Sequence, residues 1–327
     1  MKYRAFGGTG LKVSEIGLGA FPISGMQKRE DGTMHGWTGV VDDESIALIH
    51  RAEELGVNLI DSAEGYGNGH SEVVTGKALK GRRDKWIVAT KVQPNSGIDE
   101  GARDEGAVRK RVRQACENSL KRLEMETIDL YQLHAIPYEW AMPAVMETLA
   151  ALKTEGKVRW YGISTNNQSA IEQLQALGPV DVLQIGYNLI ERDADVLLNW
   201  AKDQDIGTLI RVPLAKGMLT GKYSGENAAS LPEGDLRFER FQKPETIEGL
   251  KRLPELDFLK TEERSMVQAA LRFVLDHPGV SCAIAGAKNR EQIEHNAAAS
   301  DIDSLSEDEL ARALPIADTI TTPGWIG

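Results

Sequence analysis

A repeated alternation of short apolar segments with longer amphipathic segments constrains the fold of this 327-residue chain most strongly. In DDESIALIHRAEELG, for example, Ile46, Ile49 and Ala52 recur at helical spacing and Gly56 marks the expected end of a helix. Eight apolar segments are each followed by such a helical segment: EIGLGAF, VNLID, KWIVATK, IDLYQLH, VRWYGIST, VDVLQIGYN, GTLIRV and VSCAIAG. Near-continuous apolar strands that alternate with helices predict a parallel sheet closed into a barrel.

Both ends of the chain add an element to this barrel. KYRAFGGTGLKVS predicts an N-terminal hairpin, because alternating residues flank a glycine-rich turn. SEDELARALPIADTI predicts a further helix after the eighth unit. We therefore predict an α/β fold, a (β/α)8 TIM barrel with an N-terminal β-hairpin and an extra C-terminal helix, in a single domain over residues 1–327.

An open, doubly wound sheet is the alternative architecture. It would place a G-x-G-x-x-G turn directly after its first strand. GLGAFPIS lacks the third glycine of that motif, and GYGNGHS has no later glycine at the required offset. The barrel is therefore the favoured fold.

Two long segments, Gln27 to Val41 and Tyr223 to Lys243, show neither helical nor strand periodicity. Loops of this length in a compact domain are usually functional or mobile, although a solvated insertion is the plain alternative. Trp37 in the first segment either lines a pocket or anchors the loop. The short tail TTPGWIG predicts an open pocket with broad specificity, and Trp325 either reaches that pocket or anchors the tail.

Charge and composition exclude several classes of protein. The net charge of −11 and the pI of about 5.2 disfavour binding to nucleic acid or to an anionic membrane. No apolar run approaches ~18 residues, and the first residues form no signal core. Cys116 and Cys282 fall in a predicted helix and a predicted strand, so we expect no disulfide framework and a cytoplasmic location. The six histidines are scattered without metal-binding spacing, and the oligomeric state stays open.

Four polar residues lie at, or just beyond, the ends of predicted strands. Asp61 ends VNLID, Lys91 ends KWIVATK and His134 ends IDLYQLH. Tyr66 follows Asp61 by five residues. Because the carboxyl ends of barrel strands meet at one face, we expect these side chains to share a site there, which favours an enzyme over a binding module.

These residue types suit the protonation of a carbonyl oxygen. A tyrosine has an ordinary pKa near ~10, and an ammonium group such as that of Lys91 acts to lower it. Asp61 could hold Lys91 charged, and His134 could bond to the substrate oxygen as hydride reaches its carbon. Each residue alone has a plain alternative: a helix cap, a packing residue, a solvated lysine or a structural histidine. Their occurrence together favours catalysis.

The loops after the seventh and eighth strands predict a phosphate site. Barrels often bind phosphate there, with the N-terminus of a helix assisting. The candidate residues are Lys216, Gly217 and Lys222 in PLAKGMLTGK, and Gly286, Lys288 and Arg290 in GAKNREQ. Lysine and arginine are ordinary on loops, but two basic loops at these places in an acidic protein indicate an anionic cofactor.

Nearly the whole chain resembles the aldo-keto reductase family. The matching stretches are GGTGLKVSEIGLGAF, NLIDSAEGYGNGHSE, TKV, IDLYQLH, GKVRWYGIST, LQIGYN, PLAKGMLTGKY and GAKNREQIEHN. The resemblance implies a (β/α)8 barrel that reduces carbonyls with NADPH or, less often, NADH. Its catalytic tetrad falls on Asp61, Tyr66, Lys91 and His134, with the tyrosine as proton donor.

The resemblance also implies a set of cofactor contacts. They are Ala20, Phe21, Asp61, Ser164, Thr165, Gln184, Arg211, Pro213, Leu214, Ala215, Lys216, Lys222, Gly286, Lys288, Arg290, Gln292 and Asn296. Three positions depart from the common pattern. Arg211 stands where many members stack an aromatic residue on the nicotinamide, Thr165 stands where Asn is frequent, and His295 replaces an acidic residue.

We therefore expect an NAD(P)H-dependent reductase of small aldehydes or ketones. Lys288 and Arg290 are suited to pair with a 2′-phosphate, which favours NADPH over NADH. The alternative from another class is a cofactor-binding regulatory subunit of a potassium channel, since some proteins that resemble this family act in that way. The retention of His134 and the lack of a long N-terminal extension favour the enzyme.

Overall fold

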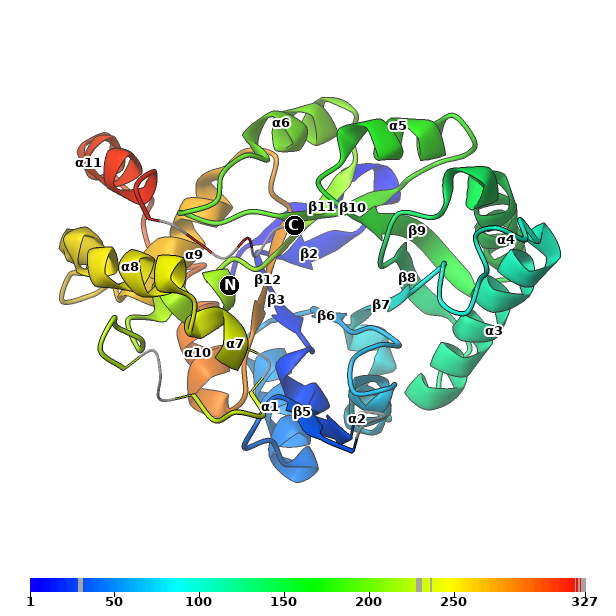
Figure 1. The fold of residues 1–327 in the computed structure, drawn as a ribbon, viewed down its shortest axis with the longest axis horizontal. Helices are drawn as coiled ribbons and strands as arrows, with labels where there is room; N and C mark the ends of the chain where they lie inside the picture. Colours follow the sequence, from blue (N-terminus) through cyan, green and yellow to red (C-terminus); the bar gives the residue numbers. More distant parts are fainter. Residues whose placement is uncertain (29–31, 228–230, 236, 321, 323, 325–327) are drawn as a thin grey trace.

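Eight parallel strands form a closed barrel, which confirms the predicted (β/α)8 architecture (Figure 1). The computed structural model describes residues 1–28, 32–227, 231–235, 237–320, 322 and 324. Around the barrel the strands follow the order β10, β11, β12, β3, β6, β7, β8 and β9. Their bounds are β3 Ile16–Gly19, β6 Leu59–Asp61, β7 Ile87–Val92, β8 Ile128–Leu133, β9 Val158–Ser164, β10 Val182–Gly186, β11 Gly207–Arg211 and β12 Cys282–Gly286.

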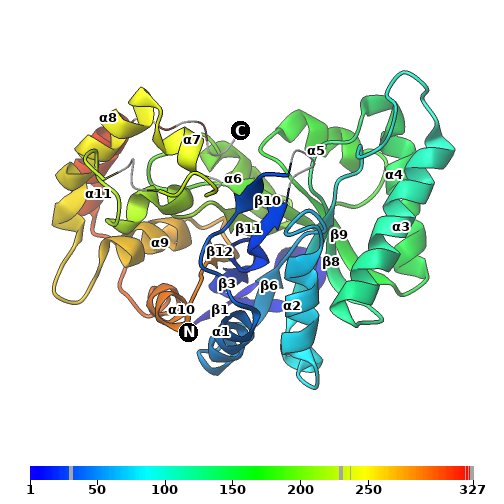
Figure 2. The same cartoon turned by 60° about the horizontal axis from the view of Figure 1, so that its bottom comes forward.

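A helix packs outside the barrel after each strand (Figures 1 and 2). These helices are α1 Asp42–Glu54, α2 His70–Leu79, α3 Glu105–Leu123, α4 Met142–Thr154, α5 Gln168–Gln175, α6 Asp195–Asp203, α9 Met266–Asp276 and α10 Arg290–Ala298. Local sequence sets the starts of two helices: Ser265 caps α9, and Ser306 caps the predicted last helix, α11 Glu307–Ala317, each in a capping box.

The predicted N-terminal hairpin closes one end of the barrel. It consists of β1 Tyr3–Ala5 and β2 Lys12–Ser14, joined through the short 3-10 helix η1 Gly7–Thr9. Phe6 is buried beneath it and packs against Gly207, where any side chain would collide with the Phe6 ring. Phe6 belongs to a hydrophobic cluster with buried residues from six barrel strands, among them Leu59, Leu130 and Leu209. The N-terminal end of the barrel is therefore filled, and the site must lie at the carboxyl end.

The two segments predicted to be irregular contain regular elements. The first contains the antiparallel pair β4 Met26–Lys28 and β5 Met34–Gly36. The second contains α7 Phe238–Phe241, and the stretch between it and α9 contains α8 Pro244–Arg252 and the 3-10 helix η7 Leu253–Leu259. We did not predict α8, because PETIEGLKR carries only two large apolar residues and buries only part of one face. Trp325 lies outside the described residues.

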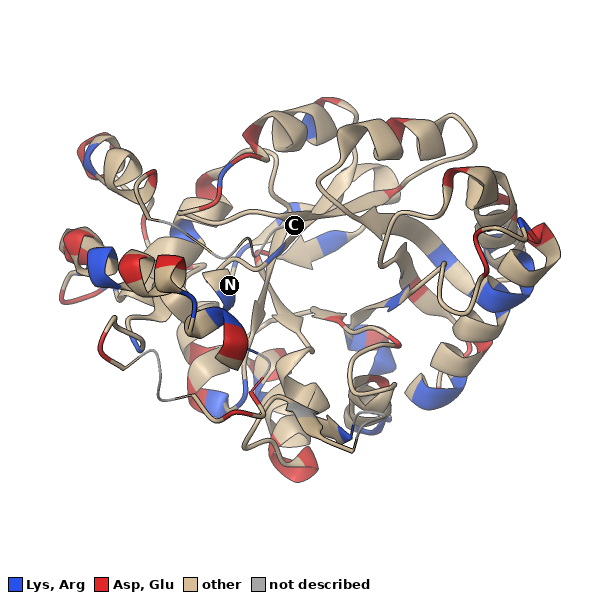
Figure 3. Cartoon of the chain, in the orientation of Figure 1, with Lys and Arg blue, Asp and Glu red and all other residues tan. Residues whose placement is uncertain are grey.

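The fold also contains short 3-10 helices and two cysteines. Further 3-10 helices within the described residues are η2 Pro22–Ser24, η3 Arg83–Lys85, η4 Glu139–Ala141 and η5 Ala215–Thr220. Cys116 in α3 and Cys282 in β12 are buried free thiols. Among the described residues, every helix is too short or too polar to cross a membrane. Figure 3 shows acidic and basic residues interspersed along the outer helices.

Candidate active site

The four residues predicted at strand ends come together at the carboxyl end of the barrel. Asp61 is the last residue of β6, Lys91 lies in β7, and His134 directly follows β8. Tyr66 lies in the loop between β6 and α2. Asp61, Tyr66 and His134 line a cavity of about 1000 Å³, and Lys91 lies behind them as a fully buried side chain.

The Lys91 ammonium connects Asp61 and Tyr66. Its Nζ donates to Asp61 Oδ2 at 2.6 Å, to the Ser62 carbonyl oxygen at 2.7 Å and to the Tyr66 hydroxyl at 3.3 Å. The three bonds use all three ammonium protons, so this buried cation is satisfied. The ammonium also lies 4.7 Å from the centre of the Tyr66 ring. Tyr66 is thereby held against a fixed positive charge.

Asp61 is fixed through both of its carboxylate oxygens. While Oδ2 pairs with Lys91, Oδ1 accepts from Gln132 Nε2 and from Gln184 Nε2, each at 3.0 Å. Asp61 is 2% exposed. A buried carboxylate with an ion pair and two amide donors keeps its charge and its orientation.

Opposing effects act on the proton affinities of this cluster. Burial acts to lower the pKa of Lys91, but the neighbouring Asp61 and Tyr66 outweigh it and leave that pKa above its ordinary value. Burial raises the pKa of Tyr66, and the Lys91 ammonium offsets this only in part. The sequence analysis expected Lys91 to bring the pKa of the phenol down; in the structure burial outweighs the ammonium, so Tyr66 is a neutral proton donor.

His134 is a neutral imidazole. Burial, helped by the positive charges of Lys91 and Arg211, lowers its pKa to about 3. Its ring meets that of Tyr66 edge to face, with centroids 5.6 Å apart. Its buried Nδ1 has no hydrogen-bond partner in the part of the chain that the structure describes. His134 therefore offers a hydrogen bond without a charge beside the tyrosine hydroxyl.

The loop that carries Tyr66 is held from both sides. The Tyr66 backbone carbonyl accepts from Ser71 N at 3.2 Å, and the Ser71 hydroxyl donates to the Ala20 carbonyl at 2.9 Å. The Phe21 ring lies 4.6 Å from the Tyr66 ring. Gly67 adopts a φ of 70°, and a Cβ there would lie only 2.9 Å from the Ser24 carbonyl oxygen. Glycine is thus required at this turn.

One arm of the cavity is strongly basic. Arg211, Lys216, Lys222, Arg237, Arg240 and Lys288 all line it; we call this set the basic arm. Burial, with Arg240 and Arg211 adding to it, lowers the pKa of Lys216 to about 8. Burial and Arg237 likewise lower the pKa of Lys288 to about 8. Crowded, partly buried cations in a protein of net charge −11 form a site for an anion.

The backbone after β11 is strained where it borders this arm. Val212, Ala215 and Lys216 have φ values of 57°, 47° and 51°, a region that non-glycine residues rarely occupy. Such conformations cost of order 1–3 kcal/mol each and concentrate at ligand-binding sites. The strained residues surround Pro213 and Leu214, which the sequence analysis assigned to the cofactor.

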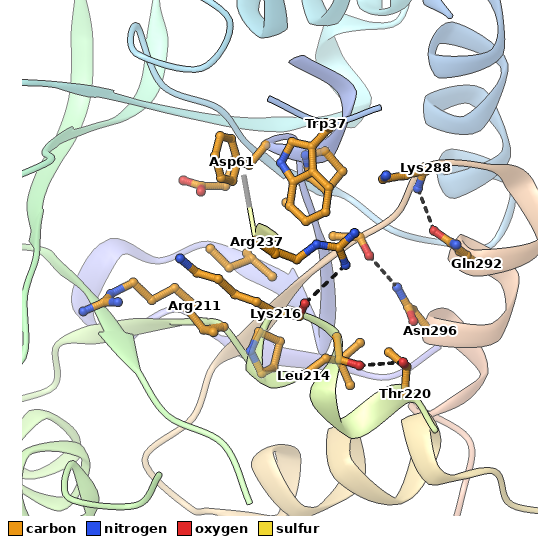
Figure 4. A pocket seen from close by; sticks show the side chains of 18 of the residues that line it. Trp37, Asp61, Arg211, Leu214, Lys216, Thr220, Arg237, Lys288, Gln292 and Asn296 are labelled. Atoms are coloured by element: carbon orange, nitrogen blue, oxygen red, sulfur yellow. Dashed lines mark hydrogen bonds between the residues drawn. The ribbon is translucent and has the colours of Figure 1, made fainter. Parts of the chain in front are cut away.

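Trp37 joins three segments over the basic arm (Figure 4). Its ring lies 4.7 Å from the Arg237 guanidinium and 4.8 Å from the Lys288 ammonium. Asp235 fixes Arg237 through two bonds of 2.8 and 2.9 Å, and Lys288 donates to the Thr38 carbonyl at 3.1 Å. Trp37 therefore lines the pocket, the first of the two roles that the sequence left open for it.

The structure places most, but not all, of the expected cofactor contacts on the cavity. Those that line it are Phe21, Asp61, Ser164, Gln184, Arg211, Pro213, Leu214, Lys216, Lys222, Gly286, Lys288, Gln292 and Asn296. Ala20, Thr165 and Ala215 are buried and are not among the lining residues. Arg290 is the exposed first residue of α10 and is likewise not among them.

At the far end of the cavity the side chains hold one another. Gln292 Oε1 accepts from the Lys288 backbone N at 2.8 Å, and Asn296 Nδ2 donates to the Gly286 carbonyl at 3.3 Å (Figure 4). His295 lies at 2.5 Å from the Ser265 hydroxyl. Among the described residues no cluster of His, Cys, Asp or Glu has the geometry of a metal site.

The sequence analysis missed Gln132, Arg237 and Arg240. Arg237 and Arg240 lie in a segment recognised only as a long loop, and no local pattern marks them as pocket residues. Gln132 stands two residues before His134 in IDLYQLH. A polar residue inside an otherwise apolar, buried strand was the available signal for it.

Comparisons with known proteins agree with this geometry. A family model described as "Aldo/keto reductase family" matches residues 12–316. The chain is 36% identical to aldo-keto reductase YhdN of Bacillus subtilis, over 99% of this chain and 96% of that protein. It is 30% identical to L-galactose dehydrogenase of Arabidopsis thaliana, over 94% of this chain and 91% of that protein.

Solved structures are similar over the same extent. The glycerol dehydrogenase AKR11B4 from Gluconobacter oxydans superposes with a TM-score of 0.80 at 30% identity, covering 97% of this chain and 95% of that one. An aldo-keto reductase from Klebsiella pneumoniae in complex with NADPH superposes with a TM-score of 0.71 at 26% identity, with the same two coverages.

Proposed function

Because the chain belongs to the aldo/keto reductase family, whose members are NAD(P)H-dependent oxidoreductases, we propose that it reduces aldehyde or ketone carbonyls with NADPH and that Tyr66 is the general acid. The observation that carries this proposal is the buried Asp61–Lys91–Tyr66 chain of contacts, at 2.6 and 3.3 Å, beside a neutral His134. Asp61, Tyr66 and His134 line the same cavity as the basic arm.

The residues that line the cavity fit a phosphorylated dinucleotide such as NADPH. The cavity of about 1000 Å³ is elongated, with Asp61 and Arg211 toward one side and Lys288, Gln292 and Asn296 toward the other (Figure 4). Lys216 and Arg237 of the basic arm lie between, where the anionic diphosphate of a dinucleotide would need cations (Figure 4). Ser164 and Gln184 would hold the carboxamide, and Lys216, Lys222 and Arg237 the diphosphate. When bound, the cofactor supplies the hydride.

The chain's own residues supply the proton and its stabilisation. Tyr66 donates its hydroxyl proton to the carbonyl oxygen as negative charge develops there. Lys91 stabilises the phenolate left behind, and its pairing with Asp61 keeps it charged at the moment of transfer. His134, being neutral, hydrogen-bonds the same oxygen and orients the carbonyl. Phe21, whose ring packs against those of Tyr66 and Trp37, lines the cavity beside the acid.

We propose NADPH as the preferred cofactor on the chemistry of Lys288. Lys288 lines the cavity together with Gln292 and Asn296, where a 2′-phosphate would be bound. Its ammonium bonds to the Thr38 carbonyl at 3.1 Å, and its lowered pKa marks a cation that an added anion would stabilise. The Klebsiella relative was crystallised with NADPH. Arg290, expected to assist, lies off the cavity, so the preference rests on Lys288 alone.

Tyr66→Phe tests the assignment of the acid. Removing one hydroxyl leaves the ring packing against Phe21 in place, so the variant should fold and bind NADPH as the wild type does. Its kcat for carbonyl reduction should fall by roughly 10²–10⁴, the usual contribution of a positioned general acid. NADPH oxidation is measured with a panel of aldehydes, ketones, sugars and pyridoxal, and cofactor binding by fluorescence titration. Undiminished turnover by Tyr66→Phe would reject the role of Tyr66.

A further inference from the structure

Gln132 is a buried amide at the base of the site that has no part in the proposed chemistry. It lies in β8, pairs in register with Lys91 of β7, and is completely buried. It does not line the cavity, so neither substrate nor cofactor would touch it. Its side chain nevertheless contacts the cluster directly: Nε2 donates to Asp61 Oδ1 at 3.0 Å, and Oε1 accepts from Gln184 Nε2 at 3.4 Å.

The two oxygens of Asp61 therefore have different tasks. Oδ2 pairs with Lys91, and Oδ1 is held by Gln132 and Gln184. Without Gln132, the Gln184 amide alone would restrain Oδ1, and that amide would itself lose the Gln132 oxygen as its second acceptor. A buried carboxylate held by fewer donors is free to turn about its side-chain bonds, which changes its distance to the Lys91 ammonium.

Resting on the proposed function, we infer that Gln132 is a positioning residue for the proton donor. It holds Asp61 in the orientation that places Lys91 against Tyr66, and it links that chain of contacts to Gln184 on the cofactor side. Gln184 in turn accepts from the Ser164 hydroxyl at 3.4 Å. A continuous polar path thus runs from the carboxamide end of the cavity, through Gln184 and Gln132, to Asp61, Lys91 and the phenol.

Removing the Gln132 amide donor should favour the protonated form of the Tyr66 phenol. The groups that act on its proton are Asp61, Lys91 and Arg211. His134 faces its ring, and the buried Cys282 thiol of β12 is coupled electrostatically to Asp61. Amide N–H groups on Asp61 Oδ1 spread its negative charge. Without one of them, more of that charge acts on the phenol and favours its protonated form.

The test uses Gln132→Met and Gln132→Glu in the full-length chain. Met keeps the length of the side chain but offers no donor. Glu keeps its shape, and beside the Asp61 carboxylate it would share one proton and donate it to Asp61 only while protonated. Thr90→Val is the matched control, because Thr90 is a buried neighbour of Lys91 whose hydroxyl bonds to Glu72 instead of Asp61.

Reductive kcat is measured against pH for each variant, together with NADPH affinity and the unfolding midpoint. Gln132→Met should lower kcat about tenfold or more, the effect of one charge-assisted hydrogen bond. It should also move the alkaline fall of kcat, which reports the deprotonation of the acid, to higher pH. NADPH affinity should stay as in the wild type. Gln132→Glu should recover kcat toward low pH, and Thr90→Val should shift only the unfolding midpoint.

Three results would overturn the inference: an unmoved alkaline limb in Gln132→Met, the same pH profile in both Gln132 variants, or an equal shift in Thr90→Val. If Gln132→Met does not fold, the comparison of Gln132→Glu with the wild type across pH decides the matter alone. Tyr66→Phe keeps the proposals separate. If the Tyr66→Phe variant is inactive while the Gln132 variants behave as the wild type, only the inference about Gln132 is rejected. If the Tyr66→Phe variant is active, the assignment of Tyr66 as the acid is rejected.

Discussion

Lys91→Met removes one partner of a fully buried ion pair. Lys91 is 0% exposed, Asp61 is 2% exposed, and Nζ and Oδ2 are 2.6 Å apart. The substitution leaves the Asp61 carboxylate with amide donors only, and it takes the donor from the Ser62 carbonyl and from the Tyr66 hydroxyl. Breaking a buried pair in this way costs about 3–5 kcal/mol, because the remaining charge is uncompensated.

Substituting the second partner, Asp61, as well should remove most of that cost. In Lys91→Met with Asp61→Asn, no buried charge remains, and an amide at position 61 still accepts from Gln132 and Gln184. Replacing a buried ion pair by neutral groups is roughly neutral in itself. The double variant also loses the bonds to Ser62 and Tyr66, each worth about 1 kcal/mol. We expect it to be destabilised by about 2 kcal/mol, less than Lys91→Met alone, while remaining inactive.

The free energy of unfolding is measured for the wild type, both single variants and the double variant by urea titration with circular dichroism. Lys153→Met is the control: this exposed lysine pairs with Asp181 at 3.5 Å, and its loss should cost less than about 1 kcal/mol.

The refuting result is additivity. If the double variant is destabilised by the sum of the two single variants, Asp61 and Lys91 do not compensate one another and the buried-pair reasoning fails. A cost for Lys91→Met no larger than for Lys153→Met would be equally damaging, since the argument depends on burial.

Two further predictions follow from the pKa shifts. The pKa of His134 is lowered from 6.5 to about 3, so as pH falls between these values the unfolded chain binds a proton that the folded chain does not, and the wild type loses about 1.4 kcal/mol of stability per pH unit. His134→Gln should flatten this slope, and equal slopes in urea unfolding would contradict the account. The pKa of Lys288 is about 8, so NADPH affinity should weaken above that pH as the ammonium is lost, and Lys288→Met should make this dependence shallower, leaving the part due to Lys216, whose pKa is also about 8. Lys288→Met should also weaken NADPH much more than NADH in fluorescence titrations, and an equal loss for both would remove Lys288 from the 2′-phosphate site.

Much of the fold was readable from local patterns. The apolar runs and helical spacings each extend over a few residues, and glycines and caps mark their ends, so the eight units and the hairpin were predicted from the sequence. The elements that the sequence did not predict are short or weakly periodic. β4 and β5 are three residues each and pair with one another, while α8 is held by contacts with neighbouring segments.

The sequence alone supplied the barrel and the four strand-end residues Asp61, Tyr66, Lys91 and His134, because both depend on residue types at regular local spacing. Only the tertiary structure revealed how these residues work together. Gln184 lies 123 residues from Asp61 and Gln132 lies 71 residues from it, yet both donate to one carboxylate oxygen because barrel closure brings β6, β8 and β10 around one interior. Burial in that interior also decided the charge states: it raised the pKa of Tyr66 despite Lys91, and it kept His134 neutral. Desolvation and the direction of side chains depend on every strand at once, and no local pattern records them.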